Sequence, residues 1–410
     1  MSKEEINVFI IGARGYTQNY GGWEALVHGL IDNWKDELVK FFVFEKVENK
    51  SDEGVLKLPQ CTCIRICVEK TGSSAMMIFD SKCTDFAQKY IKDNHLSNPI
   101  MYYLGLRIGP KVWLKRRSLK KDGIILLENP AGLEWKRTKW SKLVQVYAYI
   151  AAHFMAHAVD YMICDAEEIR NVYNKMIRTK RPKKEFISYG SYPVERVTEP
   201  MPSSVKEFFD KWEMKKDNYY LILGRFIPEN NYEMMFKGFI NSDSSRDLVV
   251  VTNYKTEIQS FLKHIQESTG YEADKRVKMV GTVYDKELLH YIRQYAHGYI
   301  HGHSVGGTNP GLLEAMSETD MNLLYGCPFN YEVGGTAAEY FSNEKELTDL
   351  IQKIDKYSED NIQEYGRRAK EKMQSEYSWE GIVEKYKELF HRIYNKGGNK
   401  AYESIDADKR

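Results

Sequence analysis

Short runs rich in β-branched and aromatic residues alternate along this chain with longer segments of helical periodicity, and this alternation limits the possible folds more than any other feature. The runs of the first half lie at residues 7–12, 39–45, 63–68, 99–104, 123–128, 161–164 and 185–190. Segments 23–34 and 75–91, which lie between such runs, repeat apolar residues with helical spacing. Strands that alternate with helices predict a parallel, doubly wound α/β sheet.

A second series of the same kind follows a proline-bearing stretch, residues 191–204, which has the composition of a linker. Its strand-like runs lie at residues 219–224, 247–252, 277–281, 298–302 and 321–326. The 410 residues are more than one compact domain usually holds, so we predict domains at 1–192 and 203–377. A helix at about 378–395 is expected to pack back on the first domain. The polar tail at 396–410 is expected to be disordered.

Composition excludes several classes of protein. Lys and Arg number 59 and Asp and Glu number 58, so the formal net charge of +1 argues against a nucleic-acid partner. The amino terminus lacks the apolar segment of a secretion signal, and six cysteines without a CxxC pair indicate reduced thiols in a cytoplasmic protein. The longest uncharged stretch, 143–159, is shorter than the ~20 apolar residues of a membrane span. We expect it to form a buried helix.

Arg225 follows the first strand of the second half and precedes a helix that starts near Tyr232. In open parallel sheets, ligands bind beyond the carboxyl ends of the strands. A guanidinium at that place can hold a phosphate with paired donors, and a helix amino terminus also favours an anion. Arg225 is therefore a candidate diphosphate ligand, with a solvated surface arginine as the alternative.

The strongest motif is HGHSVGGTNPGLLEAM, residues 301–316. Gly306 and Gly307 let the backbone approach a ligand closely, and Thr308 can cap the helix that follows. Amides at that helix start would face a phosphate. Glu314, one turn into the helix, is expected to be partly buried and to accept hydrogen bonds from ribose hydroxyls; an exposed helix residue is the alternative.

Glycines also mark two further strand ends. Gly281, Thr282 and Val283 end a strand of the second half, where backbone groups could contact a nucleobase; a simple strand-to-helix turn is the alternative. In the first half, Gly21 and Gly22 stand directly before a helix and are candidates to offer amides to phosphates, unless they only permit a turn. The loop that contains them lacks the G-x-G-x-x-G of dinucleotide-binding folds.

Taken together, the motifs resemble glycosyltransferase family 4 of the GT-B fold, and especially its bacterial rhamnosyltransferase-like subgroup. The matching stretches occur in order over both halves: IIGARGYTQNYGGWEALV (10–27), YYLGLRIGP (102–110), ENPAGLEWKRTKWS (128–141), GRFIPENN (224–231), GTVYD (281–285) and HGHSVGGTNPGLLEAM (301–316). The resemblance implies two Rossmann-like domains facing across a cleft. It also implies a retaining enzyme whose second domain binds a nucleotide-diphosphate sugar and whose first domain presents the acceptor.

In the subgroup, the donor is often dTDP-L-rhamnose, and the acceptor is a lipid-diphosphate-linked saccharide of capsule or cell-wall synthesis. The predicted donor-binding residues are Gly21, Gly22, Arg225, Asn230, Gly281, Thr282, Val283, His303, Gly306, Gly307, Thr308, Asn309 and Glu314. The predicted acceptor-binding residues are Tyr20, Arg107, Asn129, Glu134 and Arg137. The predicted catalytic residues are Arg225, Glu314, Glu134 and Asp160.

Some of these residues have structural alternatives. Arg107, Asn129 and Glu134 follow the fourth and fifth strands. Glu134 is a candidate to bind acceptor hydroxyls or to assist deprotonation, or else a salt-bridge partner of Arg137. Asp160, at the turn from a helix into a strand, matches a family Asp position but is equally placed to cap the turn.

The chain departs from the family pattern at two site positions. Gly306 stands where the first carboxylate of the family's Glu-x7-Glu pair is expected, and Asn230 replaces the basic residue that usually follows the clamp arginine. With no clear nucleophile, we expect front-side displacement, in which Arg225 and helix amides stabilise the leaving phosphate. The single Asp-x-Asp triplet, residues 406–408, lies in the tail, so neither a metal nor another cofactor is expected.

Three other functions remain open. One is a nucleotide-sugar or carbohydrate-binding protein without turnover, since a carboxylate is missing at Gly306. Another is a transferase that uses a UDP- or GDP-sugar. The last is a dinucleotide-dependent oxidoreductase, in which Glu45 at the end of the second strand would bind a ribose.

Two basic runs of the first half, residues 111–121 (KVWLKRRSLKK) and 175–184, suggest a lipid surface. The first run also contains Trp113 and Leu114. Basic residues near an anionic leaflet contribute about 1 kcal/mol each to binding. This pattern favours a peripheral enzyme at the inner face of the cell membrane, with a solvated helix face as the alternative.

Overall fold

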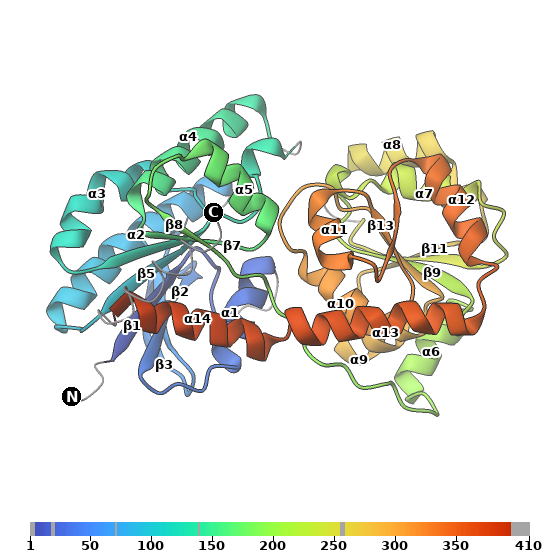
Figure 1. Ribbon diagram of the computed structural model, residues 1–410, viewed down its shortest axis with the longest axis horizontal. Helices are drawn as coiled ribbons and strands as arrows, with labels where there is room; N and C mark the ends of the chain where they lie inside the picture. The colour runs from blue at the N-terminus through green and yellow to red at the C-terminus, as the bar shows by residue number, and fades with distance from the viewer. Residues whose placement is uncertain (1–4, 18–20, 70–71, 138–139, 255–258, 395–410) are drawn as a thin grey trace, which may run out of the picture. The chain divides into compact units, whose positions relative to one another are not determined.

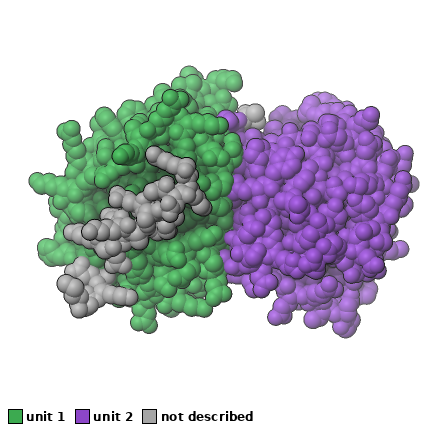
Figure 2. Space-filling view, viewed as in Figure 1, with its two compact units in different colours: residues 1–135, 142–190, 379–410 green, residues 136–141, 191–378 purple. Residues whose placement is uncertain are grey.

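The structure is a computed structural model, and it describes residues 5–17, 21–69, 72–137, 140–254 and 259–394 (Figure 1). The chain forms two compact units (Figure 2). Unit 1 comprises Met1–Trp135, Lys142–Gly190 and Trp379–Arg410, and unit 2 comprises Lys136–Ser141 and Ser191–Ser378. Tyr20 and the tail at 396–410, with its Asp-x-Asp triplet, lie outside the described residues.

Unit 1 contains an eight-stranded sheet in the order β3-β4-β2-β1-β5-β6-β7-β8. All neighbouring strands are parallel except β3 and β4, which form an antiparallel pair. The strands are β1 (Ile6–Ile11), β2 (Val39–Val47), β3 (Gly54–Lys57), β4 (Thr62–Cys67), β5 (Pro99–Leu104), β6 (Ile125–Asn129), β7 (Tyr161–Cys164) and β8 (Lys183–Phe186). Every residue of β1 and β5 is buried, as expected for strands covered by helices on both faces.

The helices of unit 1 cover both faces of this sheet (Figure 1). They are α1 (Gly22–Asp32), α2 (Ser73–Asp93), α3 (Gly109–Lys121), α4 (Lys142–Ala158), α5 (Glu167–Met176) and α14 (Trp379–Tyr394), with short 3-10 turns η1 (Lys50–Asp52) and η2 (Glu134–Lys136). The helices α2 to α5 lie on one face, and α1 lies on the other with α14. The Tyr386 hydroxyl on α14 hydrogen-bonds the Tyr102 hydroxyl at 2.8 Å, and His391 contacts Asp36 at 2.6 Å.

Unit 2 contains a six-stranded, fully parallel sheet in the order β11-β10-β9-β12-β13-β14. Its strands are β9 (Tyr219–Leu223), β10 (Asp247–Val251), β11 (Val277–Gly281), β12 (Gly298–His301), β13 (Asn322–Tyr325) and β14 (Glu339–Phe341). Its helical segments are α6 (Ser203–Lys211), η3 (Pro228–Asn230), α7 (Tyr232–Ile240), α8 (Gln259–Thr269), η4 (Tyr271–Ala273), α9 (Lys286–Gln294), α10 (Pro310–Glu318), α11 (Pro328–Gly334), α12 (Glu344–Ile354) and α13 (Glu359–Glu376). Figure 1 shows α7, α8 and α12 on one face and α9, α10 and α13 on the other.

The predicted fold class, with two Rossmann-like α/β domains, is confirmed. The sequence prediction missed β3, which is largely exposed, and β14, which has only three residues. The stretch 191–204 is not a free linker. It belongs to unit 2, where the Val197 amide donates to the Gln294 side chain at 3.0 Å and the Tyr291 hydroxyl donates to the Thr198 carbonyl at 2.7 Å.

The expectation of a buried helix at 143–159 is wrong for one side of α4. Ala148, Ala151 and Ala152 are buried, but Leu143 and several other large apolar residues of the helix are exposed. Among the described residues, no helix has the length and apolar character needed to cross a bilayer. The six cysteines are all buried and unbridged.

Candidate functional site

The strand order of unit 2 reverses between β9 and β12. From β9 the chain moves outward to β10 and β11, and it then returns to β12 and continues through β13 to β14. Ligands of open α/β sheets bind at such a reversal, beyond the carboxyl ends of the strands. The loop after β9 contains Arg225 and Asn230, and the loop after β12 contains His303 and Gly306. Two motifs that are distant in the sequence therefore meet at one point.

Hydrogen bonds hold the two loops together. The Asn231 side-chain amide donates to the Gly302 carbonyl at 2.7 Å, and the amide and hydroxyl of Ser304 donate to the Glu229 carbonyl at 3.0 and 2.9 Å. A Cβ added to Gly302 would lie 2.2 Å from the Asn230 carbonyl oxygen. Only glycine permits this close approach of the two chains.

His303 lies buried between the loops, with its Nδ1 2.8 Å from the Asn230 Oδ1. The Asn230 amide nitrogen donates to the Arg225 carbonyl at 2.7 Å, so the Asn230 oxygen faces the imidazole and can only accept. The proton of a neutral His303 is therefore on Nδ1, and Nε2 is a hydrogen-bond acceptor. Burial and the charges of Arg137 and Arg225 lower the pKa of His303 to about 3, which keeps the ring neutral.

Gly306 provides the space for this ring. A Cβ at Gly306 would lie 2.7 Å from His303 Nε2, so any side chain there would displace the imidazole. This is the position where the family pattern has a carboxylate. In this chain, the Nε2 atom of His303, a hydrogen-bond acceptor, lies where that carboxylate side chain would begin.

The helix α10 begins beside these residues. Asn309 is its N-cap, since the Asn309 side-chain oxygen accepts from the Gly311 amide at 2.9 Å, and Pro310 takes the first helical position. The expectation that Thr308 caps the helix is wrong by one residue. Thr308 is instead buried in the loop that leads into the helix. The amino terminus of α10 thus points its partial positive charge toward the loop of Gly306.

Glu314 lies one turn into α10, and 53% of its side chain is exposed, so it is more exposed than a core residue but about half-buried. The carboxylate forms an ion pair with the buried Arg293 of α9, which also contacts Glu318 at 2.9 Å. Glu314 is therefore held in place while half of it faces solvent. Sequence analysis missed Arg293; the only signal was a charged residue between apolar positions of an amphipathic helix.

Arg225 and the loop after β11 complete the carboxyl edge of unit 2. The Arg225 side chain is exposed. Thr252, which follows β10, joins the neighbouring loops, because its hydroxyl donates to the Gly224 carbonyl at 2.6 Å and its amide to the Gly281 carbonyl at 3.0 Å. Gly281 has φ +85°, and the next residue, Thr282, is exposed while Val283 is half-buried.

Unit 1 has its own reversal of strand order, between β1 and β5. Arg107, after β5, donates from Nε to Asp80 at 2.8 Å and from Nη2 to the Gly12 carbonyl at 2.7 Å. A Cβ at Gly12 would lie 2.3 Å from the Leu104 carbonyl oxygen. Arg107 therefore fixes the loop after β1, and about a third of its side chain is exposed at this edge.

The loop after β1 leads to α1, whose N-cap is Gly21 with φ +133°. Among the described residues, no heavy atom lies within 4 Å of a Cβ placed at Gly22, so they leave the first turn of α1 open. Glu24 is buried and accepts from the Arg14 amide at 2.8 Å. Glu45, the acid that an oxidoreductase would need for a ribose, instead accepts from the Thr17 hydroxyl at 2.7 Å.

Two predicted site residues have structural partners for their side chains. Asn129 is buried, and its oxygen accepts from the Ala131 amide at 3.0 Å, so it does not present its side chain to an acceptor. Asp160 precedes β7, at the opposite edge of the sheet, where it pairs with Lys120 at 2.7 Å and accepts from the Leu126 amide at 3.2 Å. These contacts fit the structural alternative, in which Asp160 caps the turn into β7.

Arg137 lies in a short segment outside unit 1. Residues 136–141 group with unit 2, and the Arg137 charge acts on His303. Arg137 thus groups with the donor-binding residues of unit 2, and its part in acceptor binding stays a prediction. Glu134 remains in unit 1 at the start of η2, half-buried, after the carboxyl end of β6.

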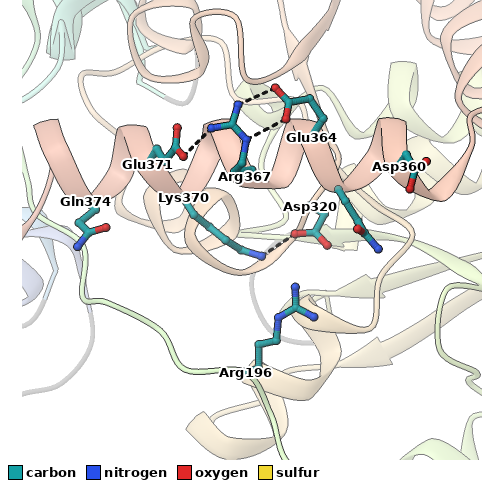
Figure 3. A pocket seen from close by; sticks show the side chains of 9 residues that line it. Arg196, Asp320, Asp360, Glu364, Arg367, Lys370, Glu371 and Gln374 are labelled. Carbon is teal, nitrogen blue, oxygen red and sulfur yellow. Dashed lines mark hydrogen bonds and ion pairs between the residues drawn. The ribbon is translucent and has the colours of Figure 1, made fainter.

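An open depression of about 510 Å³ lies elsewhere on unit 2, along α13 (Figure 3). Its charges compensate one another: Arg367 contacts Glu364 at 2.8 Å and Glu371 at 2.6 Å, and Lys370 contacts Asp320 at 2.6 Å. Asp320 precedes β13, so the depression borders the amino edge of the sheet. It does not share the strand reversal with the residues above. Within the described ranges, no three His, Cys, Asp or Glu side chains form a potential metal cluster.

Comparisons with known proteins bear on the fold. A family model described as a domain of unknown function, DUF1972, matches residues 5–192. Sucrose-phosphate synthase from Thermosynechococcus elongatus is similar in structure with a TM-score of 0.75 at 15% identity, covering 95% of this chain and 99% of that one. The structural neighbours of the chain are GT-B glycosyltransferases, which have two Rossmann-like domains. The chain has the GT-B fold.

Two further GT-B structures are similar over nearly the whole chain. HepE from Anabaena, in complex with UDP, has a TM-score of 0.69 at 10% identity, with 94% of this chain and 100% of that one covered. The UDP-forming α,α-trehalose-phosphate synthase from Burkholderia xenovorans, in complex with glucose-6-phosphate, has a TM-score of 0.71 at 8% identity, with coverage of 94% and 100%. No curated protein sequence matches the chain. At such low sequence identity, these structural similarities show the fold alone.

Proposed function

We propose that this chain is a retaining glycosyltransferase that binds a nucleotide-diphosphate sugar at the carboxyl edge of unit 2. The observation on which this proposal rests is the meeting of Arg225, His303 and the amino terminus of α10 at the strand reversal. A guanidinium and a helix amino terminus are suited to an anion, and a strand reversal is where such folds bind ligands. The GT-B fold of UDP-binding and UDP-forming neighbours supports the same assignment.

Each group has a chemical role in this proposal. Arg225 and the amides of residues 306–309 hold the diphosphate, and Glu314, fixed by Arg293, accepts from ribose hydroxyls. The backbone of residues 281–283 contacts the nucleobase. His303 Nε2 accepts from a hydroxyl of the transferred sugar in place of the missing carboxylate.

The reaction follows from this charge arrangement. The acceptor oxygen forms a bond to the anomeric carbon on the face from which the phosphate leaves, and the carbon–phosphate oxygen bond breaks. The leaving phosphate takes the proton of the acceptor hydroxyl, while Arg225 and the α10 amides stabilise its developing negative charge. Catalysis consists mainly of positioning, and no metal or other cofactor is part of the proposal.

The finer assignment of substrates comes from the motif resemblance. We propose L-rhamnose, from dTDP-L-rhamnose, as the transferred sugar, and a lipid-diphosphate-linked saccharide of capsule or cell-wall synthesis as the acceptor. The enzyme would act from the cytoplasm in peripheral contact with the inner face of the membrane. A UDP- or GDP-sugar is the alternative donor, and a binding protein without turnover is the alternative function.

A transfer assay with the purified full chain tests this proposal. The chain is incubated with dTDP-L-rhamnose, UDP-glucose or GDP-mannose and a lipid-diphosphate-linked saccharide, and the product mass is measured. We expect the acceptor to gain one deoxyhexose and the donor to release dTDP. Tight donor binding without any product would contradict the transferase and support the binding protein.

Two variants connect the activity to the site. Arg225→Ala and Glu314→Ala each remove charged hydrogen bonds worth about 1.5–3 kcal/mol, so we expect kcat/KM to fall by roughly 10- to 150-fold. Arg196→Ala and Glu371→Ala, which change the same residue types at the depression on α13, should leave it unchanged. Equal activities of all four variants would refute the site assignment.

A further inference from the structure

The outer surface of α3 and α4 in unit 1 is unusually apolar. Of the twelve most exposed large apolar side chains in the described part of the chain, eight lie on these two helices. They are Trp113, Leu114, Leu143, Val144, Val146, Tyr147, Tyr149 and Ile150. Single exposed apolar residues are common, but contiguous apolar patches on a monomer mark interaction sites.

An ordinary surface helix turns its large apolar residues toward the core, whereas α4 exposes several of them. Leu143, Val146, Tyr147 and Ile150 follow the spacing i, i+3, i+4 and i+7, so they form one stripe along the helix. Their side chains are exposed by 84, 57, 38 and 44%. The side of α4 that packs into unit 1 consists largely of alanines. The large apolar groups thus face outward, and the small ones fill the core.

The neighbouring helix α3 extends this surface, which we call the α3–α4 surface. The two helices lie side by side (Figure 1), and a Cβ on Gly109 of α3 would lie 2.1 Å from the Ala151 carbonyl oxygen of α4. The Trp113 ring packs edge-on against Phe154 at 5.2 Å between ring centres. Leu114, the next residue, is 73% exposed.

The charges on α3 and α4 themselves have one sign. Neither helix contains an Asp or Glu, whereas α3 has six basic residues and α4 begins with Lys142. Asp85 of α2 contacts Lys111 and Lys115 at 2.6 Å. Arg117, Lys121 and Lys142 are exposed. The second basic run of the chain meets the end of α3, because Arg181 and Lys120 both contact Asp160, at 3.7 and 2.7 Å.

We infer that the α3–α4 surface binds an anionic lipid bilayer, with the stripe of α4 inserted among the headgroups and the cations of α3 against the phosphates. An apolar stripe flanked by basic residues is typical of helices that lie in the interface of an anionic bilayer. Each basic residue near an anionic leaflet strengthens partitioning by roughly fivefold. The Tyr147 hydroxyl donates to the Arg107 carbonyl at 2.8 Å, so the stripe adjoins the carboxyl edge of the unit 1 sheet.

This inference rests on the proposed function only in its purpose: a bilayer at this edge would bring a lipid-linked acceptor to unit 1. The binding itself is independent of transfer. It is measured by cosedimentation of the full chain with vesicles of phosphatidylcholine alone, or of phosphatidylcholine with about 30% phosphatidylglycerol. We expect binding to the anionic vesicles that weakens with salt, and little binding to the neutral ones.

Matched variants locate the surface. Leu143→Ser/Ile150→Ser and Arg117→Glu/Lys121→Glu should each lower the partition coefficient by about tenfold or more. Val55→Ser and Lys57→Glu change exposed residues of the same types on β3 and should have no effect. The double variants Leu143→Ser/Ile150→Ser and Arg117→Glu/Lys121→Glu should retain transfer to a detergent-dispersed acceptor, because none of the residues that they change belongs to the site.

Three results would overturn the inference. The first is equal vesicle binding by Leu143→Ser/Ile150→Ser and the wild type, and the second is no binding by the wild type. The third is a concentration-dependent dimer in light scattering that Leu143→Ser disperses, which would make a second copy of the chain the occupant. Vesicle binding without transfer from any donor would instead refute the proposed function and leave this inference standing.

Discussion

His303 and Gly306 share one small volume at the carboxyl edge of unit 2, at the position where glycosyltransferase family 4, which the motifs resemble, has a carboxylate. The Asn230 oxygen fixes the proton of His303 on Nδ1, so Nε2 accepts hydrogen bonds. The sequence shows Asn230 and His303 but not their contact, because this hydrogen bond joins loops after different strands. Arg293 was missed for the same reason: its partner Glu314 lies on the next helix.

Gly306→Ala tests whether the imidazole is the group that this glycine accommodates. The new Cβ would lie 2.7 Å from Nε2 and push the ring away, so kcat/KM for the donor should fall by about 10- to 100-fold through the loss of one hydrogen bond. A double-mutant cycle with His303→Ala gives the decisive comparison. We expect Gly306→Ala to have little further effect once the ring is absent. Fully additive losses would show that Gly306 acts on something else.

The buried histidines of unit 2 should make its stability depend on pH. Burial lowers the pKa of His297 to about 4 and of His301 and His303 to about 3, from an ordinary value of 6.5. Below pH 6.5 the unfolded chain therefore binds protons that the folded chain does not, and stability falls as the pH falls toward 4. Each histidine contributes about 1.4 kcal/mol per pH unit to this slope.

In His303→Gln, the free energy of unfolding should fall less steeply between about pH 5.5 and 4.5, by the contribution of one histidine. The measurement is urea unfolding followed by circular dichroism. The exposed His157 gives the control, since His157→Gln should leave the slope as it is in the wild type. Equal slopes for both variants would contradict a neutral, buried His303.

At the scale of elements, strands were predicted better than helix environments. The ranges of β5, β7 and β11 agree with the sequence runs. For β5 the reason is that a parallel strand buried on both faces leaves a continuous apolar segment. The environment of α4 was predicted wrongly, because a helix that is apolar on every side looks like a core helix. Periodicity cannot distinguish an alanine face that packs inward from a leucine stripe that faces solvent.

The attachment of α14 to unit 1 depends on a contact with α1. A Cβ on Gly29 would lie 2.0 Å from the Trp379 ring, so Gly29→Ala forces α14 to move. We expect unit 1 to lose about 1–3 kcal/mol of stability in urea unfolding followed by tryptophan fluorescence. Gly22→Ala, on the same helix, meets no atom of the described residues within 4 Å and should change stability by less than about 1 kcal/mol. Similar losses for both variants would contradict the tight α1–α14 packing.

At the scale of the whole molecule, βα alternation and chain length were sufficient to predict two Rossmann-like units. They were not sufficient to predict the path of the chain between them. Residues 136–141, for example, follow β6 of unit 1 but group with unit 2, whereas α14 groups with unit 1, where a helix at about 378–395 was expected to pack. The exchange at 136–141 depends on tertiary contacts, which no local pattern encodes.

The central claim is that a nucleoside diphosphate binds at the strand reversal of unit 2. A crystal structure of the full chain with dTDP tests it most directly. We expect a pyrophosphate within hydrogen-bonding distance of the Arg225 guanidinium and the amides of residues 306–309, with the ribose hydroxyls at Glu314. A dTDP molecule bound elsewhere, with Arg225 and the start of α10 in contact with water only, would contradict it.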